Sequence, residues 1–302
     1  MTGEGTYYVP EQSKLPIFAS LGLFLTVYGA ASWINGNGSS IFWVGSLVMA
    51  VVVWSWFSIV ISENIAGLNS IQLKRSYVWG MGWFIFSEVM FFAAFFGALF
   101  YIRQIALPEL GGDNTTNEIL WSGFKEAWPL MVTPDMAANG DKATVIGPGI
   151  NMSITTAESI WTWLPFWNTT VLLTSSFTVH FAHTALKNDK KNGLWGFNFW
   201  LGVTVALGII FLFLQAEEYI HSYQENLKLD TGAYGTTFFM LTGFHGAHVT
   251  LGTLMLLVMW LRSIMKDHFN HKDCFGFEAA SWYWHFVDVV WLGLFIFVYI
   301  LG

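Results

Sequence analysis

The stretch WGMGWFIFSEVMFFAAFFGALFY, Trp79–Tyr101, carries no charged residue other than Glu88, which lies near its middle. It is long enough to cross a bilayer as a helix, since a crossing needs about 20 predominantly apolar residues. An ionised and unpaired carboxylate at that depth costs from about 3 to more than 10 kcal/mol. Glu88 therefore needs a buried partner, a water-filled path, or a proton that keeps it neutral.

The composition of the whole chain also indicates a membrane protein. Of its 302 residues, 54% are hydrophobic and 11% are charged, whereas soluble domains carry about 25% charged residues. The 17 Trp and 28 Phe residues suit packed membrane helices with aromatic side chains at the interfaces. A single cysteine, Cys274, excludes an internal disulfide framework and a cysteine-based metal cluster.

Seven stretches are long and apolar enough to cross a membrane, so we predict an all-α, polytopic membrane protein. The polar turn NGNGSS, Asn35–Ser40, joins the first two and predicts a tight helical hairpin. The N-terminal segment lacks the basic region of a signal peptide, so we expect the first span to remain in the mature protein. The predicted spans are Leu15–Ile34, Ile41–Ile61, Trp79–Tyr101, Leu164–Leu186, Leu194–Tyr219, Ala233–Leu261 and Ala279–Leu301.

The basic residues predict how the chain is oriented. With seven crossings the loops alternate sides, and the 13 Lys and Arg residues divide into nine and four. Basic residues in short loops favour the cytoplasmic side, so we expect a cytoplasmic N-terminus and an outer C-terminus. The larger group is Lys14, Lys74, Arg75, Lys187, Lys190, Lys191, Arg262, Lys266 and Lys272, and the smaller is Arg103, Lys125, Lys142 and Lys228.

Several further polar residues fall within the predicted spans. Some pairs share a helix face because residues three apart are neighbours on a helix. Such groups either satisfy one another across helix interfaces or carry protons; for Glu88 we favour a functional or lipid-linked role. The groups are His245 with His248 near the middle of the sixth span, His285 with Asp288 in the seventh, Glu217, Glu218 and His221 at the outer end of the fifth, and His180 with His183 at the inner end of the fourth.

Two alternative functions depend on these polar residues. The pairs His180–His183, His245–His248 and Glu218–His221 suggest a di-iron oxygenase, but its ligands must converge at one depth and these pairs do not. We therefore expect no metal or haem in this chain. A self-contained proton channel or transporter is the second alternative, but the Gly/Pro-broken helices and repeat symmetry typical of transporters are absent from the sequence.

From the third span onward the motifs resemble those of a known family. They are FSEVMFF (Phe86–Phe92), PELGG (Pro108–Gly112), NTTVLL (Asn168–Leu173), Ala182–His183, LQAEEY (Leu214–Tyr219), YGTTFFMLTGFHGAHV (Tyr234–Val249) and FGFEAASWYWHFVDVVW (Phe275–Trp291). Together they resemble subunit III of the haem–copper cytochrome c oxidases, of the bacterial aa type. Spans one and two match mainly by position and hydropathy.

This resemblance implies a fold and a role. The fold is a two-helix hairpin (residues 1–62) and a five-helix bundle (residues 63–302) with a phospholipid-holding cleft between them, and here an outer loop insertion at about residues 107–163. The role is that of a non-catalytic subunit in the bacterial inner membrane, with a cytoplasmic N-terminus and a periplasmic C-terminus. It carries no haem or copper itself, packs against subunit I, sustains proton uptake and protects the binuclear centre from inactivation during turnover.

The resemblance further implies partners and site residues. Haem and copper are expected in partner subunits, and the partners are subunits I and II, small accessory subunits, phospholipids, and cytochrome c as substrate of the complex; nucleic acid is not expected. Glu88 matches the family's carbodiimide-reactive carboxyl group, which must be at least partly protonated. We expect no catalytic residue. Proton-linked candidates are Glu88, His245, His248, His285, Asp288 and Glu218, and lipid-headgroup candidates are Glu63, Asn69 and Arg262.

Two departures from the family pattern leave alternatives open. Many members carry a histidine before the third span, where this chain has Asn69 or a neighbour. The long outer loop is either a docking surface or a solvated insertion. Subunit III of a quinol oxidase is the closest rival, but those chains usually lack the first two spans.

Overall fold

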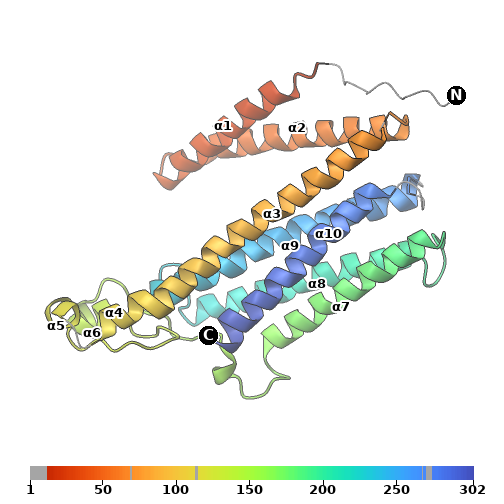
Figure 1. Ribbon diagram of the computed structural model, residues 1–302. Coiled ribbons are helices and arrows are strands. Elements are labelled where there is room, and N and C mark those ends of the chain that lie inside the picture. The colour runs from red at the N-terminus through yellow and green to blue at the C-terminus, as the bar shows by residue number, and fades with distance from the viewer. Residues whose placement is uncertain (1–11, 69, 113–114, 267, 270–273) are drawn as a thin grey trace. The chain divides into compact units, whose positions relative to one another are not determined.

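The computed structural model describes residues 12–68, 70–112, 115–266, 268–269 and 274–302, and within these ranges the regular structure is helical, with no strand. Figure 1 shows long helices joined by loops. Six of them are long and apolar enough to cross a membrane: α1 (Leu15–Ile34), α2 (Ser40–Ile65), α3 (Ile71–Tyr101) with its continuation to Gly111, α8 (Phe197–Gln224), α9 (Gly232–Lys266), and α10 (Phe275–Leu294) with its continuation to Ile300.

The fourth predicted span forms α7 (Leu164–Lys187), a helix of 24 residues. It is too polar to be among the six apolar helices. Six of the seven predicted spans are therefore confirmed as helices that can cross a membrane. A crossing by α7 stays a prediction.

Helix boundaries differ from the predicted spans mainly at polar ends. α3 begins at Ile71 rather than Trp79, and its first turns carry Lys74 and Arg75. Lys and Arg are good helix formers, and their long side chains reach polar surroundings from a helix end. Hydropathy therefore marks the apolar part of a helix and misses its polar extension. Two π-helical turns continue the long helices, η1 (Ile102–Ala106) after α3 and η4 (Phe295–Ile300) after α10.

The chain forms two compact units, Met1–Gly80 and Met81–Gly302, and the boundary between them lies within α3. The domain boundary expected after residue 62 stays a prediction. In the first unit, α1 and α2 pack as a hairpin. Their backbones approach closely at Gly29 and Gly45, where an added Cβ atom would collide with the backbone of Phe42 and Thr26 respectively. Gly36 and Gly38 give the turn its left-handed backbone, with φ of 79° and 91°.

The core of the second unit lies among α7, α8, α9 and α10. Trp284 and Trp291 of α10 are fully buried there, as is Phe211 of α8. α3 adds Phe92 and Leu99 to the same core. Because these helices pack around large aromatic side chains, a polar group on an inner face is stabilised when it pairs inside the bundle.

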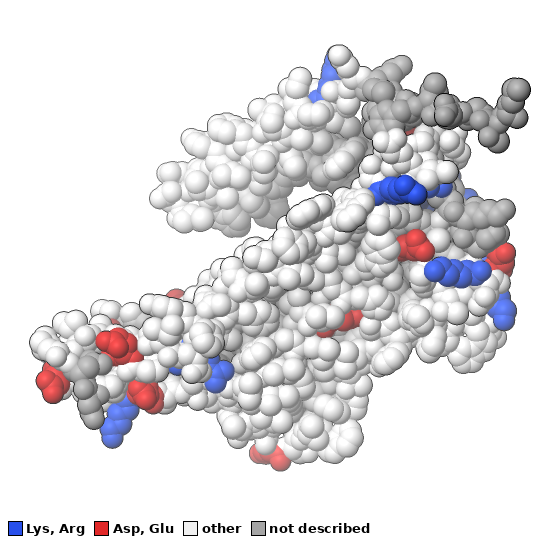
Figure 2. Space-filling view, viewed as in Figure 1, with Lys and Arg blue, Asp and Glu red and all other residues white. Residues whose placement is uncertain are grey.

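The expected outer insertion is folded over part of its length. It contains α4 (Leu107–Gly111), α5 (Thr115–Leu120), α6 (Pro134–Asn139) and two 3₁₀ turns, η2 (Gly140–Lys142) and η3 (Ile154–Thr156). Phe124 and Leu130 are buried, and the Met152 backbone N–H donates to the Tyr234 hydroxyl of α9 over 2.9 Å. Figure 2 shows acidic side chains gathered at the end that carries α5 and α6.

Arg103 connects this insertion to the end of the chain. Its Nη2 donates to the carbonyl oxygen of Leu301 over 2.7 Å, and its Nη1 donates to that of Phe297 over 3.3 Å. Its guanidinium group also lies over the Trp128 ring, 5.2 Å from the ring centroid. One cation therefore holds together α3's continuation, the insertion and the C-terminal π-helical turn.

Candidate functional site

Glu88 of α3 faces His248 of α9, with Oε2 2.9 Å from Nε2. The other ring nitrogen, Nδ1, lies 2.6 Å from the Phe244 carbonyl oxygen. A carbonyl oxygen can only accept, so Nδ1 carries a hydrogen. The Glu88–His248 contact then contains a single proton, which lies on either the carboxyl group or the imidazole. Both side chains are partly buried, 22% and 12% exposed.

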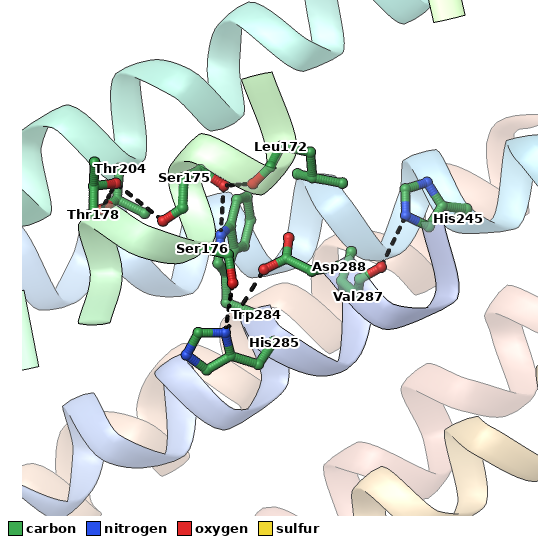
Figure 3. Close-up of polar contacts among 10 residues, drawn as sticks. All are labelled: Leu172, Ser175, Ser176, Thr178, Thr204, His245, Trp284, His285, Val287 and Asp288. Carbon is green, nitrogen blue, oxygen red and sulfur yellow. Dashed lines mark hydrogen bonds and ion pairs between the residues drawn. The ribbon is translucent and has the colours of Figure 1, made fainter. Parts of the chain in front are cut away.

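His245 points elsewhere, although it shares a helix face with His248. It is fully buried, and its Nε2 lies 3.2 Å from the Val287 carbonyl oxygen (Figure 3). Its ring packs against Trp291, with the ring centroids 5.0 Å apart. His245 thus joins α9 to α10 inside the bundle, whereas His248 joins α9 to α3.

Ser176, His285 and Asp288 come together between α7 and α10 (Figure 3). His285 Nδ1 lies 2.9 Å from Ser176 Oγ and 3.7 Å from Asp288 Oδ2. A nucleophilic triad needs the serine on one ring nitrogen and the acid on the other. Here both face the same nitrogen, so the arrangement does not activate Ser176. It can hold a proton, and Asp288 is 4% exposed.

Glu218 is 1% exposed and lies near the C-terminal end of α8. The Tyr299 hydroxyl donates to its Oε1 over 2.6 Å, and Asn168 Nδ2 donates to its Oε2 over 3.2 Å. Glu217 and His221, expected in the same cluster, are exposed. The structure therefore separates one buried acid from two side chains on the surface of α8.

The inner face of α7 carries a row of polar residues that the sequence analysis did not select. Each pairs with a residue of α8 or α10, so the polar side chains of α7 contribute to helix packing. The available signal was a spacing of three or seven residues, as in Asn168–Ser175, Thr169–Ser176 and Ser175–Thr178, because it places residues on one helix face. The pairs are Asn168–Glu218, Thr169–Trp291, Ser175–Trp284, Ser176–His285 and Thr178–Thr204.

The remaining candidates lie apart from these contacts. Glu63 lies in α2, in the first unit, and Arg262 lies in α9, in the second. The Arg262 guanidinium group lies over the Phe269 ring, 4.8 Å from the ring centroid. Asn69 falls outside the described residues. His183 Nε2 is 3.1 Å from Glu278 Oε1 near the C-terminal end of α7.

A metal-binding constellation is not formed in the part of the chain that the structure describes, where no three His, Cys, Asp or Glu side chains converge. The expectation that the chain holds no metal or redox centre stays a prediction. The polar interior consists of hydrogen-bonded acids and imidazoles that can retain or transfer protons. Together with the long apolar helices, it indicates a multi-pass membrane protein with acids and imidazoles inside its helical bundle.

Comparison with known proteins places this membrane protein in a family. The family model described as "Cytochrome c oxidase subunit III" matches residues 5–121 and 151–302. The chain belongs to the cytochrome c oxidase subunit III family, which confirms the resemblance seen in its motifs. Residues 122–150, between the two matched ranges, lie within the predicted insertion.

Curated relatives agree over nearly the whole chain. "Cytochrome c oxidase subunit 3" of Equus caballus is 35% identical over 295 residues, which cover 97% of this chain and 96% of the relative. The protein of the same title from Ceratotherium simum is 34% identical with the same coverage. That from Gazella subgutturosa is 33% identical over 294 residues, again 97% and 96% of the two chains. Family membership implies that the chain works together with other oxidase subunits.

Proposed function

We propose that this chain is the non-catalytic subunit III of a proton-pumping cytochrome c oxidase, and that haem and copper are held by partner subunits. It packs against subunit I, supports proton uptake and prolongs the active life of the catalytic centre. The observation that carries this role is the Glu88–His248 contact, in which an acid and a base hold one proton within apolar helices. Family membership supplies the oxidase context.

Seven crossings belong to the same proposal. α7 can cross because each of the inward polar side chains named above makes at least one hydrogen bond in the bundle, and its exposed Thr170 and Thr174 donate to carbonyl oxygens of their own helix. The charge balance supports this. With residues 103–163 left out, seven crossings place nine Lys and Arg on one side and Lys228 on the other. If α7 does not cross, the division becomes six and four, which is a much weaker bias.

The favoured topology has a cytoplasmic N-terminus and a periplasmic C-terminus in a bacterial inner membrane. Subunit II, accessory subunits and cytochrome c would then meet the outer side, where the insertion lies. Phospholipid headgroups are proposed ligands of Glu63 and Arg262, since a guanidinium group suits a phosphate. Asn69 is retained as a third candidate from the sequence.

Replacing Glu88 by Gln tests the role of the proton. The amide keeps the size and a hydrogen bond to His248 but cannot carry the transferable proton. We expect the oxidase to assemble, to lose carbodiimide labelling of this chain, and to complete fewer turnovers before it inactivates. The measurements are subunit content, labelling by mass spectrometry, and activity followed over repeated turnover.

Glu217→Gln is the matched control, because Glu217 is an exposed acid of the apolar helix α8. It should leave labelling of Glu88 and the catalytic lifetime unchanged. Loss of assembly in Glu88→Gln would show a structural role for Glu88 instead. An unchanged catalytic lifetime in that variant would contradict the proposal.

Two alternative functions are separated by independent measurements. The α1–α2 hairpin favours a cytochrome c oxidase over a quinol oxidase, and co-purification with a subunit that bears a dinuclear copper site would decide between them. A stand-alone transporter would give ion or solute flux when the purified chain alone is placed in liposomes. We expect no flux; flux that depends on Glu88 would overturn the proposed function.

A further inference from the structure

Gln215 of α8 places a whole amide group inside the second unit without a protein partner. The residue is 5% exposed, and neither its Nε2 nor its Oε1 has a hydrogen-bond partner among the described residues. Burying an amide in this way is costly, and most buried polar groups in proteins are bonded to protein or to water. An aromatic or aliphatic side chain at this position would avoid that cost.

Glu218 lies one turn beyond Gln215 on the same face of α8. A second unsatisfied group, on α7, lies next to Glu218. Asn168 of α7 is fully buried and uses its Nδ2 on Glu218, but its Oδ1 has no partner in the described part of the chain. Residues 215 and 218 are helix neighbours. Gln215, with both ends of its amide unbonded, is therefore a helix neighbour of the buried carboxyl group that Asn168 contacts.

The polar atoms of two aromatic side chains in this part of the bundle are already in use, that of Trp291 on Thr169 and that of Tyr299 on Glu218. Phe211, the preceding inward residue of α8, packs edge-on against Trp291 with the ring centroids 4.8 Å apart. The Trp291 ring also lies 5.9 Å from that of Tyr299, whose hydroxyl is already used on Glu218. Gln215 is thus placed between an aromatic layer and the layer that contains Glu218.

We propose that buried water binds among Gln215, Asn168 and Glu218. Water is the ligand that suits this set, since it can accept from Gln215 Nε2 and donate to Asn168 Oδ1 or Gln215 Oε1. Buried waters typically make about three hydrogen bonds, and they occupy polar sites whose groups lack other partners. A metal ion fits poorly, because Glu218 is the single carboxylate of the group and two hydrogen-bond donors already face it.

High-resolution cryo-electron microscopy of the intact complex that contains this chain tests the site directly. We expect ordered density within hydrogen-bond distance of the Gln215 amide and of Asn168 Oδ1, and its loss in Gln215→Met. A well-resolved core without such density would overturn the proposal. A direct hydrogen bond from the Gln215 amide to Glu218 in its place would do the same.

Thermal stability gives a second test, because a hydrated and an unhydrated Gln215 predict shifts of the dissociation temperature in opposite directions. Met matches Gln in length but cannot replace its hydrogen bonds, so Gln215→Met should lower the temperature at which the complex loses this subunit. Gln224→Met is the control, because Gln224 is an exposed residue of the same helix, and should leave that temperature unchanged. If Gln215 were unhydrated, its replacement would remove an unsatisfied amide and raise the temperature, which would refute water binding.

Discussion

At position 88 a lone carboxyl group meets one imidazole, and the two residues that share the proton lie 160 positions apart in the sequence. Charge and hydropathy select Glu88, since it is the only charged residue within Trp79–Tyr101. His248 is one of eight histidines, and its spacing from His245 indicates a shared helix face. In the structure the two side chains contact different helices. A helix face does not define a shared site when the side chains point to different neighbours.

The base beside Glu88 can be removed by His248→Phe. Without the imidazole, the carboxyl group is left in mostly apolar surroundings and retains its own proton. We expect faster carbodiimide labelling of Glu88, because the reagent reacts with the protonated acid. His221→Phe, which changes an exposed histidine of α8, should leave the labelling rate unchanged. Slower labelling in His248→Phe would mean that the imidazole keeps the carboxyl group reactive.

In the insertion, the hydrogen bonds of Asp135 predict that local stability depends on pH. Backbone N–H donation from Val145, followed by bonds from Asn139 and Thr144, lowers the pKa of Asp135 to about 2. A lowered pKa means that these bonds stabilise the fold fully above the ordinary carboxyl pKa and are lost as the pH falls through about 2. Amide-exchange protection of residues 144 and 145, corrected for the intrinsic exchange rate, should be constant from neutral pH to about pH 4 and then fall.

Asp135→Ala should produce the same loss of protection at neutral pH. Asp141→Ala, at an exposed acid of the neighbouring 3₁₀ turn, serves as the control. Protection that drops already between neutral pH and about pH 5 would assign the effect to another group.

At the scale of single elements, the close packing of α1 against α2 depends on glycines, which have no side chain to separate the two backbones. Gly45→Ala places a methyl group against the backbone near Thr26, which cannot move aside, whereas Gly22→Ala meets the side chains of Met49 and Val48, at 3.0 Å. We expect Gly45→Ala to destabilise the hairpin by about 1–3 kcal/mol and Gly22→Ala to have a smaller effect. Thermal unfolding followed by limited proteolysis of the hairpin measures the difference, and equal effects would contradict close backbone packing.

α7 shows how an element can be polar in sequence and still suit a membrane. Ser175 and Thr178 are buried and bond to α10 and α8, so their hydroxyl groups do not face lipid. Its exposed side chains include Phe177 and Phe181. Mean hydropathy adds inward and outward residues together, and it therefore underestimates a helix whose polar face is covered by neighbours.

At the scale of the whole molecule, seven crossings and six crossings place the C-terminus on opposite sides if the N-terminus is fixed. With seven, a reporter fused after Gly302 is periplasmic and one inserted between α7 and α8 is cytoplasmic. An enzyme that is active only in the periplasm measures the first, and a reporter that fluoresces only in the cytoplasm measures the second. A reporter at the N-terminus fixes the reference side. A cytoplasmic C-terminus with a cytoplasmic N-terminus would exclude seven crossings.

The sequence alone determined what depends on local composition. Long apolar runs specify membrane helices because each residue contributes to the transfer free energy independently of its neighbours in space, and Glu88 stands out within such a run for the same reason. The motifs in the second half of the chain identify the family without reference to any contact.

The tertiary structure decided which groups meet. His248 beside Glu88, Tyr299 and Asn168 around Glu218, and Arg103 over Trp128 all join residues from separate elements. These pairings arise from helix packing, which fixes the rotation and depth of each helix relative to the next. No periodicity within one helix contains that information, so the proton-holding contacts and the folded insertion emerge only once the helices are assembled.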